Sequence, residues 1–277
     1  MRVAFQGELG AFSQQAILQL LGAKARSVPH ARFDQVFAAL DKGSVDAAAI
    51  PIENTLHGSV YANYDLLLKY DFTITAETNV RIVLNLIAPP GMSFGQVRKA
   101  YSHPVAIDQC LEFFARHKRV ERESFYDTAG AVKMIMAERP AGGAAIASEL
   151  AAKMYKARIL KRGIEDDRQN YTRFFLLERA GSKARVNRSG QSPWKTSLVF
   201  STRNMPGALF RALSALALRD LNLVKIESRP LRGKPWEYLF YLDLLGKRDD
   251  AAVKNALAHL AEVADFLRVL GSYRAGV

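Results

Sequence analysis

Short apolar runs alternate with segments of helical periodicity through most of the chain. Residues 2–6 are an apolar run, and residues 12–21 follow with apolar side chains at helical spacing. A second helical pattern covers residues 33–40, and another apolar run over 46–50 is expected to end at Pro51. Strands that alternate with helices in this way predict α/β layers with mostly parallel sheets.

The alternation continues beyond Pro51. Asp127 and Ser148 each precede a helical segment, at the N-cap position where a side-chain oxygen accepts from free backbone N–H groups. The further predicted elements are strands over 80–88, 144–147 and 171–177, and helices over 106–115 and 128–137.

The composition of the chain changes after residue 181. Apolar periodicity disappears, and Gly, Ser, Lys, Arg and Asn dominate, which predicts a linker over 182–193. The block that follows has the order strand, helix, strand, strand, helix, strand, with Pro206 in the first turn of its first helix. This order is the split, ferredoxin-like pattern, and it does not by itself indicate a function.

Composition narrows the class of protein. Apolar residues make up 49% of the 277 residues, which is enough for well-filled cores. The single cysteine, Cys110, excludes a disulfide framework and a cysteine-based zinc site within one chain, and fits a reducing compartment. No signal peptide precedes the first strand and no apolar run has the length of a membrane span, so we expect a cytoplasmic protein.

The net charge of +12 has two interpretations, a nucleic-acid surface or a basic surface that attracts anionic metabolites. Lys and Arg are spread along the chain without a basic tail or a nucleic-acid motif. We therefore expect small anionic ligands, and no nucleic-acid or membrane partner.

Polar residues follow several of the predicted strands, where α/β proteins tend to bind ligands. The first group is the turn 7–13, whose glycines and helix start suit an anion, although a plain tight turn has the same pattern. The second is 51–60, where an acid, an amide, hydroxyls and an imidazole crowd behind an apolar strand. The third is Ser102, with Gln109 on the helix after it; Ser102 is either an anion ligand or an ordinary N-cap.

The fourth group opens the strand over 171–177. Arg173 offers a bidentate clamp for a carboxylate. Asn170 and Thr172 share one face of the strand, so Arg173 belongs to the opposite face unless the strand bends there. The sequence leaves this conflict open.

These motifs together resemble the motif series of prephenate dehydratases and of the closely related arogenate dehydratases. The resemblance covers essentially the whole chain, since the second block resembles a phenylalanine-binding ACT domain. Small departures are Thr55 where Ser is common, Val105 where Gln is usual, and His57 before Gly58. The motifs, in order, are Gly7-x-x-Gly10-x-x-Ser13, Pro51-Ile52-Glu53-Asn54, Ser102-His103-Pro104, Asp127 to Ala131 and Asn170-x-Thr172-Arg173-Phe174.

The resemblance implies a two-lobed catalytic domain of the type II periplasmic-binding-protein kind over 1–181. Its lobes would be 1–79 with 171–181, and 80–170. A ferredoxin-like βαββαβ ACT domain would follow over 194–277. We also expect a monofunctional chain, because no chorismate mutase segment precedes Met1.

The implied reaction converts prephenate to phenylpyruvate, water and carbon dioxide, without a metal or another cofactor. Thr172 would donate a proton or hydrogen bond to the leaving hydroxyl. Because a threonine hydroxyl is a poor acid, we expect Glu53 or a relayed water to help supply the proton. The other implied site residues are Asn54, Ser102 and Gln109 as catalytic or positioning groups, and Ser13, Thr128, Asn170 and Arg173 as substrate-binding groups.

His57 and His103 are alternative acids, although a lone histidine in a loop is more often structural. The ACT resemblance implies feedback inhibition by phenylalanine in a homo-oligomer, a dimer or a tetramer. The implied effector residues are Gly207, Ala208, Leu209, Asn222, Glu227, Ser228, Arg229 and Pro230. Two functions compete with prephenate dehydration: arogenate dehydration, and a non-catalytic amino-acid-binding regulator.

Overall fold

A computed structural model describes residues 1–182, 192–231, 233–234 and 236–276. The chain divides into two compact units, Met1–Asp71 with Thr78–Arg179, and Phe72–Glu77 with Ala180–Val277. The grouping of Phe72–Glu77 with the C-terminal part was not predicted from the sequence. Most of the predicted linker over 182–193 lies outside the described residues, and the exact domain boundaries stay predictions.

The first lobe of the first unit is built on a mixed sheet with the order β2-β1-β3-β11-β5, and β4 pairs with β3. β1 is parallel to β2 and β3, whereas β11 returns antiparallel to β3. The strands are β1 (Arg2–Gln6), β2 (Arg26–His30), β3 (Ala47–Asn54), β4 (Gly58–Ser59), β5 (Phe72–Arg81) and β11 (Tyr171–Arg179), and the helices are α1 (Phe12–Leu21), α2 (Phe33–Asp41) and α3 (Tyr61–Lys69).

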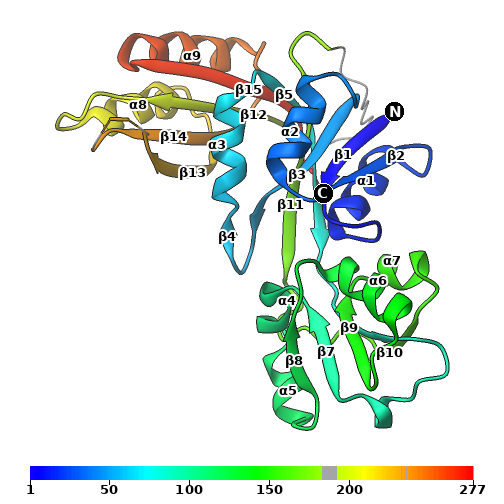
Figure 1. The fold of residues 1–277 in the computed structure, drawn as a ribbon. Helices are drawn as coiled ribbons and strands as arrows, with labels where there is room; N and C mark the ends of the chain where they lie inside the picture. Colours follow the sequence, from blue (N-terminus) through cyan, green and yellow to red (C-terminus); the bar gives the residue numbers. More distant parts are fainter. Residues whose placement is uncertain (183–191, 232, 235, 277) are drawn as a thin grey trace. The chain divides into compact units, whose positions relative to one another are not determined.

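The second lobe of this unit has a sheet with the order β10-β6-β9-β7-β8, in which β7, β8 and β9 run side by side (Figure 1). Its strands are β6 (Asn85–Ala88), β7 (Lys99–Ser102), β8 (Glu121–Ser124), β9 (Gly143–Ala147) and β10 (Arg158–Lys161). Its helices are α4 (Pro104–Asp108), α5 (Leu111–Arg116), α6 (Thr128–Glu138) and α7 (Glu149–Met154), with the 3-10 turn η1 (Phe94–Gln96). The unit therefore has the α/β layers that the sequence pattern predicted and the two lobes that the family resemblance implied.

Both predicted N-caps of this lobe are confirmed. Asp127 accepts from Gly130 N at 2.6 Å, and Ser148 Oγ accepts from Ala151 N at 3.0 Å. Cys110 is fully buried in the core of the lobe, and this burial raises the pKa of its thiol. A buried thiol of this kind is poorly reactive, because the thiolate is the nucleophile.

Three of the predicted elements were wrong. The strand predicted to end at Pro51 continues to Asn54, and a register shift in the pairing with β11 accommodates the proline. The strand predicted over 80–88 is interrupted at 82–84, and the helix predicted over 106–115 is broken between Asp108 and Leu111. The sheets are mixed rather than mostly parallel, because the strands that pass between the lobes run against their neighbours.

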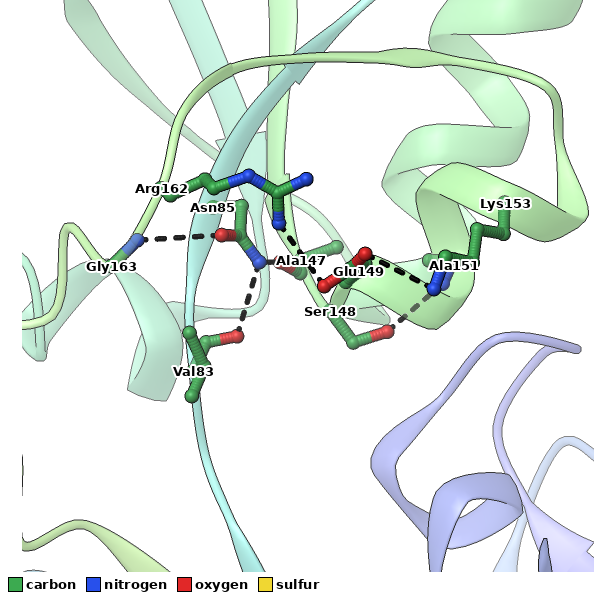
Figure 2. A network of polar contacts seen from close by, with 9 residues as sticks. All are labelled: Val83, Asn85, Ala147, Ser148, Glu149, Ala151, Lys153, Arg162 and Gly163. Carbon is green, nitrogen blue, oxygen red and sulfur yellow. Dashed lines mark hydrogen bonds and ion pairs between the residues drawn. The ribbon is translucent and has the colours of Figure 1, made fainter.

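The segment 82–84 passes from one lobe to the other, and hydrogen bonds hold it to the second lobe. Figure 2 shows the buried Asn85, whose Nδ2 donates to the carbonyls of Val83 and Ala147 while its Oδ1 accepts from Gly163 N. Leu84 N donates to the nearly buried Glu165 carboxylate at 2.9 Å. The crossing segment is therefore fixed where it reaches the second lobe.

The second unit has the predicted βαββαβ order, with an antiparallel sheet ordered β13-β14-β12-β15. Leu198 and Phe200 of β12 pack with the two helices in its core. Pro206 precedes the N-cap Gly207 instead of lying in the first helical turn, which corrects the prediction. The elements are β12 (Trp194–Ser201), α8 (Ala208–Ala217), β13 (Leu223–Pro230), β14 (Tyr238–Leu245), α9 (Ala251–Val263) and β15 (Phe266–Arg274).

A buried ion pair joins the segment Phe72–Glu77 to this sheet. Lys195 Nζ lies 2.6 Å from Glu77 Oε1, and the two side chains are 14% and 1% exposed. Gly276 N also donates to Glu77 Oε1, at 2.9 Å. In the described part of the chain, no helix has the length and apolar character needed to cross a membrane.

Candidate functional site

A cavity of about 410 Å³ lies within the first unit, and residues of both lobes line it. Most of its polar lining follows strand ends, as the sequence predicted for ligand sites. The lining residues are Gln6, Phe12, Phe33, Pro51, Asn54, His57, Gly58, Ser59, Val60, Ile82, Leu84, His103, Val105, Ala106, Gln109, Thr128 and Thr172.

Asn54 and Thr172 lie together in this cavity although they are 118 residues apart in sequence. They face each other on the paired strands β3 and β11, and Asn54 Nδ2 donates to Thr172 Oγ1 at 2.9 Å. The same Nδ2 donates to the Asn170 side chain at 2.8 Å and to the Tyr171 carbonyl at 3.1 Å. Pairing of two strands from distant parts of the chain thus brings together three of the predicted site residues.

The orientation of the Asn54 amide is determined from both ends. Its Oδ1 accepts from Leu56 N and His57 N, each at 3.0 Å, so its Nδ2 must point toward Thr172. An amide nitrogen only donates, and the Thr172 oxygen is therefore the acceptor in this bond. The Thr172 O–H proton therefore takes no part in this bond.

Arg173 and Glu53 lie opposite each other on the same two strands but are not among the cavity-lining residues. Arg173 Nη1 lies 3.9 Å from Glu53 Oε2, and its guanidinium stacks over the ring of Phe175 at 4.7 Å. Residues two apart share a strand face, so Arg173 follows Phe175 and not Thr172. The conflict in the sequence is resolved in favour of regular strand alternation.

Ser102 and Ser13 are buried and do not line the cavity. Ser102 Oγ donates to the Ile146 carbonyl at 2.6 Å and so links β7 to β9. Ser102 therefore supports the loop that carries His103, a lining residue, rather than facing the cavity itself. Asn170 is also fully buried, and its Nδ2 has no hydrogen-bond partner among the described residues.

Gln109 and Thr128, both predicted site residues, line the cavity from the second lobe. Thr128 is the first residue of α6, and Phe12, which faces the cavity from the other lobe, is the first residue of α1. Free backbone N–H groups at a helix start favour a bound anion. Asp127 already caps the start of α6, whereas the start of α1 has no side-chain cap, so the α1 start is the one that suits a ligand with negative charge.

His57 and His103 line the cavity as well, although the sequence favoured a structural role for both. His103 Nδ1 accepts from Val105 N at 3.3 Å, and His57 Nδ1 lies 3.1 Å from Gln109 Nε2. The described lining contains no Lys, Arg, Asp or Glu side chain, so these imidazoles are its titratable groups. The sequence had named both histidines as alternative acids, and the departure from the family pattern at His57 was a further signal for this role.

The glycine-rich turn after β1 joins the two lobes. Gly10 has a positive φ of 94°, and a Cβ there would lie 2.5 Å from Ala151 Cα, so no other residue fits. The Gly10 carbonyl accepts from Ser148 Oγ at 2.6 Å. Glu8 extends this contact with an ion pair to Lys133 at 3.1 Å. Glu8 and Gly10 of this predicted motif hold the lobes against each other, whereas Phe12 of the same turn lines the cavity.

Asp127 lies beside the same turn, and the pKa of its carboxyl group makes the stability of the fold depend on pH. Burial, with a smaller contribution from the nearby Glu8, raises the pKa of its carboxyl, although backbone hydrogen bonds such as that from Gly130 oppose the shift. A raised pKa in the folded state means that stability falls as pH rises from the unfolded-state value through the folded-state value.

We therefore expect Asp127→Asn, which keeps the N-cap but cannot ionise, to melt a few degrees higher than the wild type at pH 7. The difference should shrink toward zero as the pH falls below the unfolded-state value of aspartate. Thermal unfolding followed by circular dichroism across this range measures it. A variant that melts lower at pH 7 would show that the charge on Asp127 is stabilising.

The predicted effector residues lie in the second unit. Ala208 and Leu209 line a cavity of about 130 Å³, with Trp236, Tyr238 and Phe240 opposite them. The predicted group at 227–230 lies on β13, which pairs with the cavity-lining strand β14 but contributes no residue to this lining. Asn222 is exposed, and only its backbone carbonyl has a hydrogen bond among the described contacts. One chain therefore brings part of the predicted effector set to one cavity.

Comparison with known proteins places the chain among characterised relatives. The prephenate dehydratase family model matches residues 3–182, and the ACT domain model matches 196–262. Arogenate dehydratase/prephenate dehydratase 2 of Arabidopsis thaliana, named as chloroplastic, is 43% identical over 99% of this chain and 72% of its own length.

Two solved structures are similar over the full chain. Prephenate dehydratase from Arthrobacter aurescens in complex with L-Phe is 31% identical with a TM-score of 0.89, over 99% of this chain and 90% of that one. GqqA, described as a novel type of quorum quenching acylase, is 30% identical with a TM-score of 0.90, over 100% of this chain and 98% of that one. The chain belongs to the prephenate dehydratase family and carries a C-terminal ACT domain.

Proposed function

We propose that the protein is a prephenate dehydratase, which converts prephenate and one proton to phenylpyruvate, water and carbon dioxide. The observation that carries the proposal is the Asn54–Thr172 hydrogen bond inside a cavity that both lobes line. The ring carboxylate leaves as carbon dioxide, and its electron pair enters the ring as the C–O bond breaks. The ring becomes aromatic, so the enzyme need only orient the substrate and assist departure of the hydroxyl group.

Thr172 would assist the leaving oxygen with its O–H group. Since Asn54 occupies an acceptor site of the Thr172 oxygen, the Thr172 proton can point to the substrate hydroxyl. A threonine hydroxyl is too weak an acid to give up its proton completely, and we propose that it donates a hydrogen bond while a water supplies the proton.

Substrate recognition would rely on neutral donors, the uncapped start of α1 and imidazoles. The described cavity lining carries no lysine or arginine, so the two carboxylates of prephenate would contact groups such as Gln109, Thr128 and His103. The basic surface, with a net charge of +12, would draw the dianion toward the protein.

The proton role that we expected for Glu53 has little support, because its carboxylate faces Arg173 and is not among the lining residues. We propose instead that Glu53 and Arg173 orient the end of β3 from outside the cavity. Ser13, Ser102 and Asn170, expected to contact the substrate or the reaction, would act as buried supports for the lining.

The deciding experiment is a single-turnover assay with prephenate that measures phenylpyruvate and released carbon dioxide. We expect one equivalent of each for every prephenate consumed. Binding of phenylalanine without turnover of prephenate or arogenate would instead support the non-catalytic regulator.

Arogenate dehydration is the main alternative, because the Arabidopsis relative is named for both substrates. Arogenate carries an ammonium group where prephenate has a keto group, and an ammonium group favours a carboxylate partner. The described lining has no Asp or Glu, which favours prephenate. We expect kcat/KM to be higher for prephenate, and a higher value for arogenate would reverse this preference.

An acylase activity is a second candidate because of the similarity to GqqA. Ser59 and His57 both line the cavity, and a serine and a histidine are a possible nucleophile and base for amide hydrolysis. An assay with an N-acylated amine, on the wild type and on Ser59→Ala, would test for release of the free amine.

The ACT domain would bind phenylalanine and inhibit the enzyme, as suggested by the L-Phe complex of the Arthrobacter relative. We propose a homo-oligomer, because one chain gathers only part of the predicted effector residues at one cavity. A second chain would supply residues such as those at 227–230 to complete the site. Analytical ultracentrifugation with and without phenylalanine would test for a dimer or a tetramer.

Gly207 provides a separate test of the effector site. It caps α8 with a positive φ of 74°, next to the lining residue Ala208. We expect Gly207→Val to weaken inhibition by phenylalanine roughly tenfold or more, because a branched side chain strains this backbone. Uninhibited kcat should remain near the wild-type value, and equal phenylalanine sensitivity would remove the assignment.

We propose that the protein works in a reducing compartment, the cytoplasm. The single cysteine fits the reducing cytoplasm. The Arabidopsis relative is named as chloroplastic. Fractionation of native cells, with immunodetection of the chain, would decide the compartment.

A further inference from the structure

We infer that His57 is a positioning residue that holds Gln109 at the substrate cavity across the two lobes and links this contact to Asn54 and Thr172. The inference rests on the proposed function, since it concerns the cavity in which prephenate would react. His57 lies in the turn between β3 and β4, and Gln109 lies between α4 and α5 of the other lobe.

On the first lobe, the backbone of His57 is part of the network that orients Asn54. His57 N and Leu56 N both donate to Asn54 Oδ1, and this leaves Asn54 Nδ2 for Thr172. A change in the position of this turn would therefore change the direction of the Asn54 amide. The backbone N–H of His57, the residue whose imidazole contacts Gln109, is therefore connected to the Thr172 hydroxyl through the Asn54 side chain.

On the second lobe, Gln109 is positioned by its backbone and exposes little of its side chain. Its carbonyl accepts from Asp166 N at 2.8 Å, and the residue is 8% exposed. The free end of its side chain is the amide that reaches His57, with Nε2 and Nδ1 3.1 Å apart. A glutamine side chain has three rotatable torsions, so its amide needs such a partner to keep one orientation.

The chemistry of the contact assigns a tautomer to His57. The amide nitrogen of Gln109 only donates, so His57 Nδ1 accepts and the ring proton lies on Nε2. A different side chain at position 57 can replace the imidazole in this contact if it has a hydrogen-bond acceptor near the place of Nδ1. An aromatic ring without a nitrogen fills the same space and cannot.

Because the His57 side chain is exposed, substitutions there can distinguish a positioning role in catalysis from a structural role in folding. His57 is exposed, so its side chain contributes little buried surface to folding. The neighbouring Leu56 is 44% exposed, lies in the same turn and does not line the cavity, which makes Leu56→Ala a matched control.

The kinetic experiment compares His57→Phe, His57→Asn, Gln109→Ala and the double variant His57→Phe/Gln109→Ala. We expect His57→Phe to lower kcat about tenfold with a smaller change in KM, as for a misplaced positioning group. His57→Asn should restore most of kcat, and the double variant should be no slower than Gln109→Ala alone. Wild-type rates for His57→Phe, or losses that multiply in the double variant, would overturn the inference.

A second measurement does not depend on turnover. In protein labelled with ¹⁵N-histidine, the His57 ring should show the tautomer protonated at Nε2, and its Nδ1 signal should shift in Gln109→Ala but not in Leu56→Ala. An unchanged Nδ1 signal in Gln109→Ala overturns the contact even if the enzyme is inactive on prephenate. Absence of prephenate turnover together with the expected shift would refute the proposed function and retain the contact.

Discussion

Thr172→Val is expected to lower kcat for prephenate by about 10²- to 10⁴-fold, the range typical of losing a group that assists a leaving group. Valine keeps the shape of threonine but has no hydroxyl, so the departing oxygen loses its hydrogen-bond donor. KM should change much less, because the carboxylates of the substrate would contact other lining residues. Steady-state kinetics with purified protein measure both constants.

Thr172→Ser is the matched control for this experiment, since it keeps an O–H group next to Asn54 Nδ2. It should retain a large part of kcat. If Thr172→Val were as active as Thr172→Ser, the hydroxyl would have no part in the chemical step, and water alone would assist the leaving group.

Lys195→Met is expected to have the largest effect on stability, about 3–5 kcal/mol, because it leaves a buried charge without its ion-pair partner. Glu77 is only 1% exposed, and Lys195 Nζ lies 2.6 Å from its carboxylate. The methionine side chain fills a similar volume, so the loss of stability comes from removal of the lysine charge and not from a cavity. Chemical denaturation of the full chain, followed by near-UV circular dichroism, measures the change in the transition of the second unit.

Two controls separate this pair from ordinary surface charges. Lys247→Met removes the partner of Asp249 in a pair whose side chains are 41% and 71% exposed, and should cost less than about 1 kcal/mol. Glu77→Gln in the Lys195→Met background should recover much of the stability, because it removes the buried charge. Equal effects of Lys195→Met and Lys247→Met would contradict the importance of the buried pair.

Local pattern was sufficient for many elements of the fold. The apolar spacing of α1 and α6, the apolar run of β9 and the caps Asp127 and Ser148 depend on residues within a few positions of each other. Each of these features has a local physical cause, the helical period or a side chain that satisfies free N–H groups. For the same reason, the βαββαβ order of the second unit could be predicted from the sequence.

The local pattern predicted the wrong strand bounds where contacts with strands distant in sequence determine the structure. Pro51 ends a strand by its own chemistry, yet the register shift against β11 lets β3 continue to Asn54. The strand predicted over 80–88 is broken because the chain crosses between lobes at 82–84. These deviations occur beside the cavity, where tertiary contacts override local preference.

The sequence by itself determined the βαββαβ order of the second unit, the family, and the presence of Asn54, Gln109 and Thr172 as residues suited to a cavity. Strand alternation already favoured Arg173 on the face opposite Thr172. The tertiary structure alone decided that Glu53 lies outside the cavity lining, that Ser102 is buried, and that His57 meets Gln109. The reason is physical: strand alternation and helix period act over a few residues, whereas the pairing of β3 with β11 and the contact of the lobes join groups more than fifty residues apart.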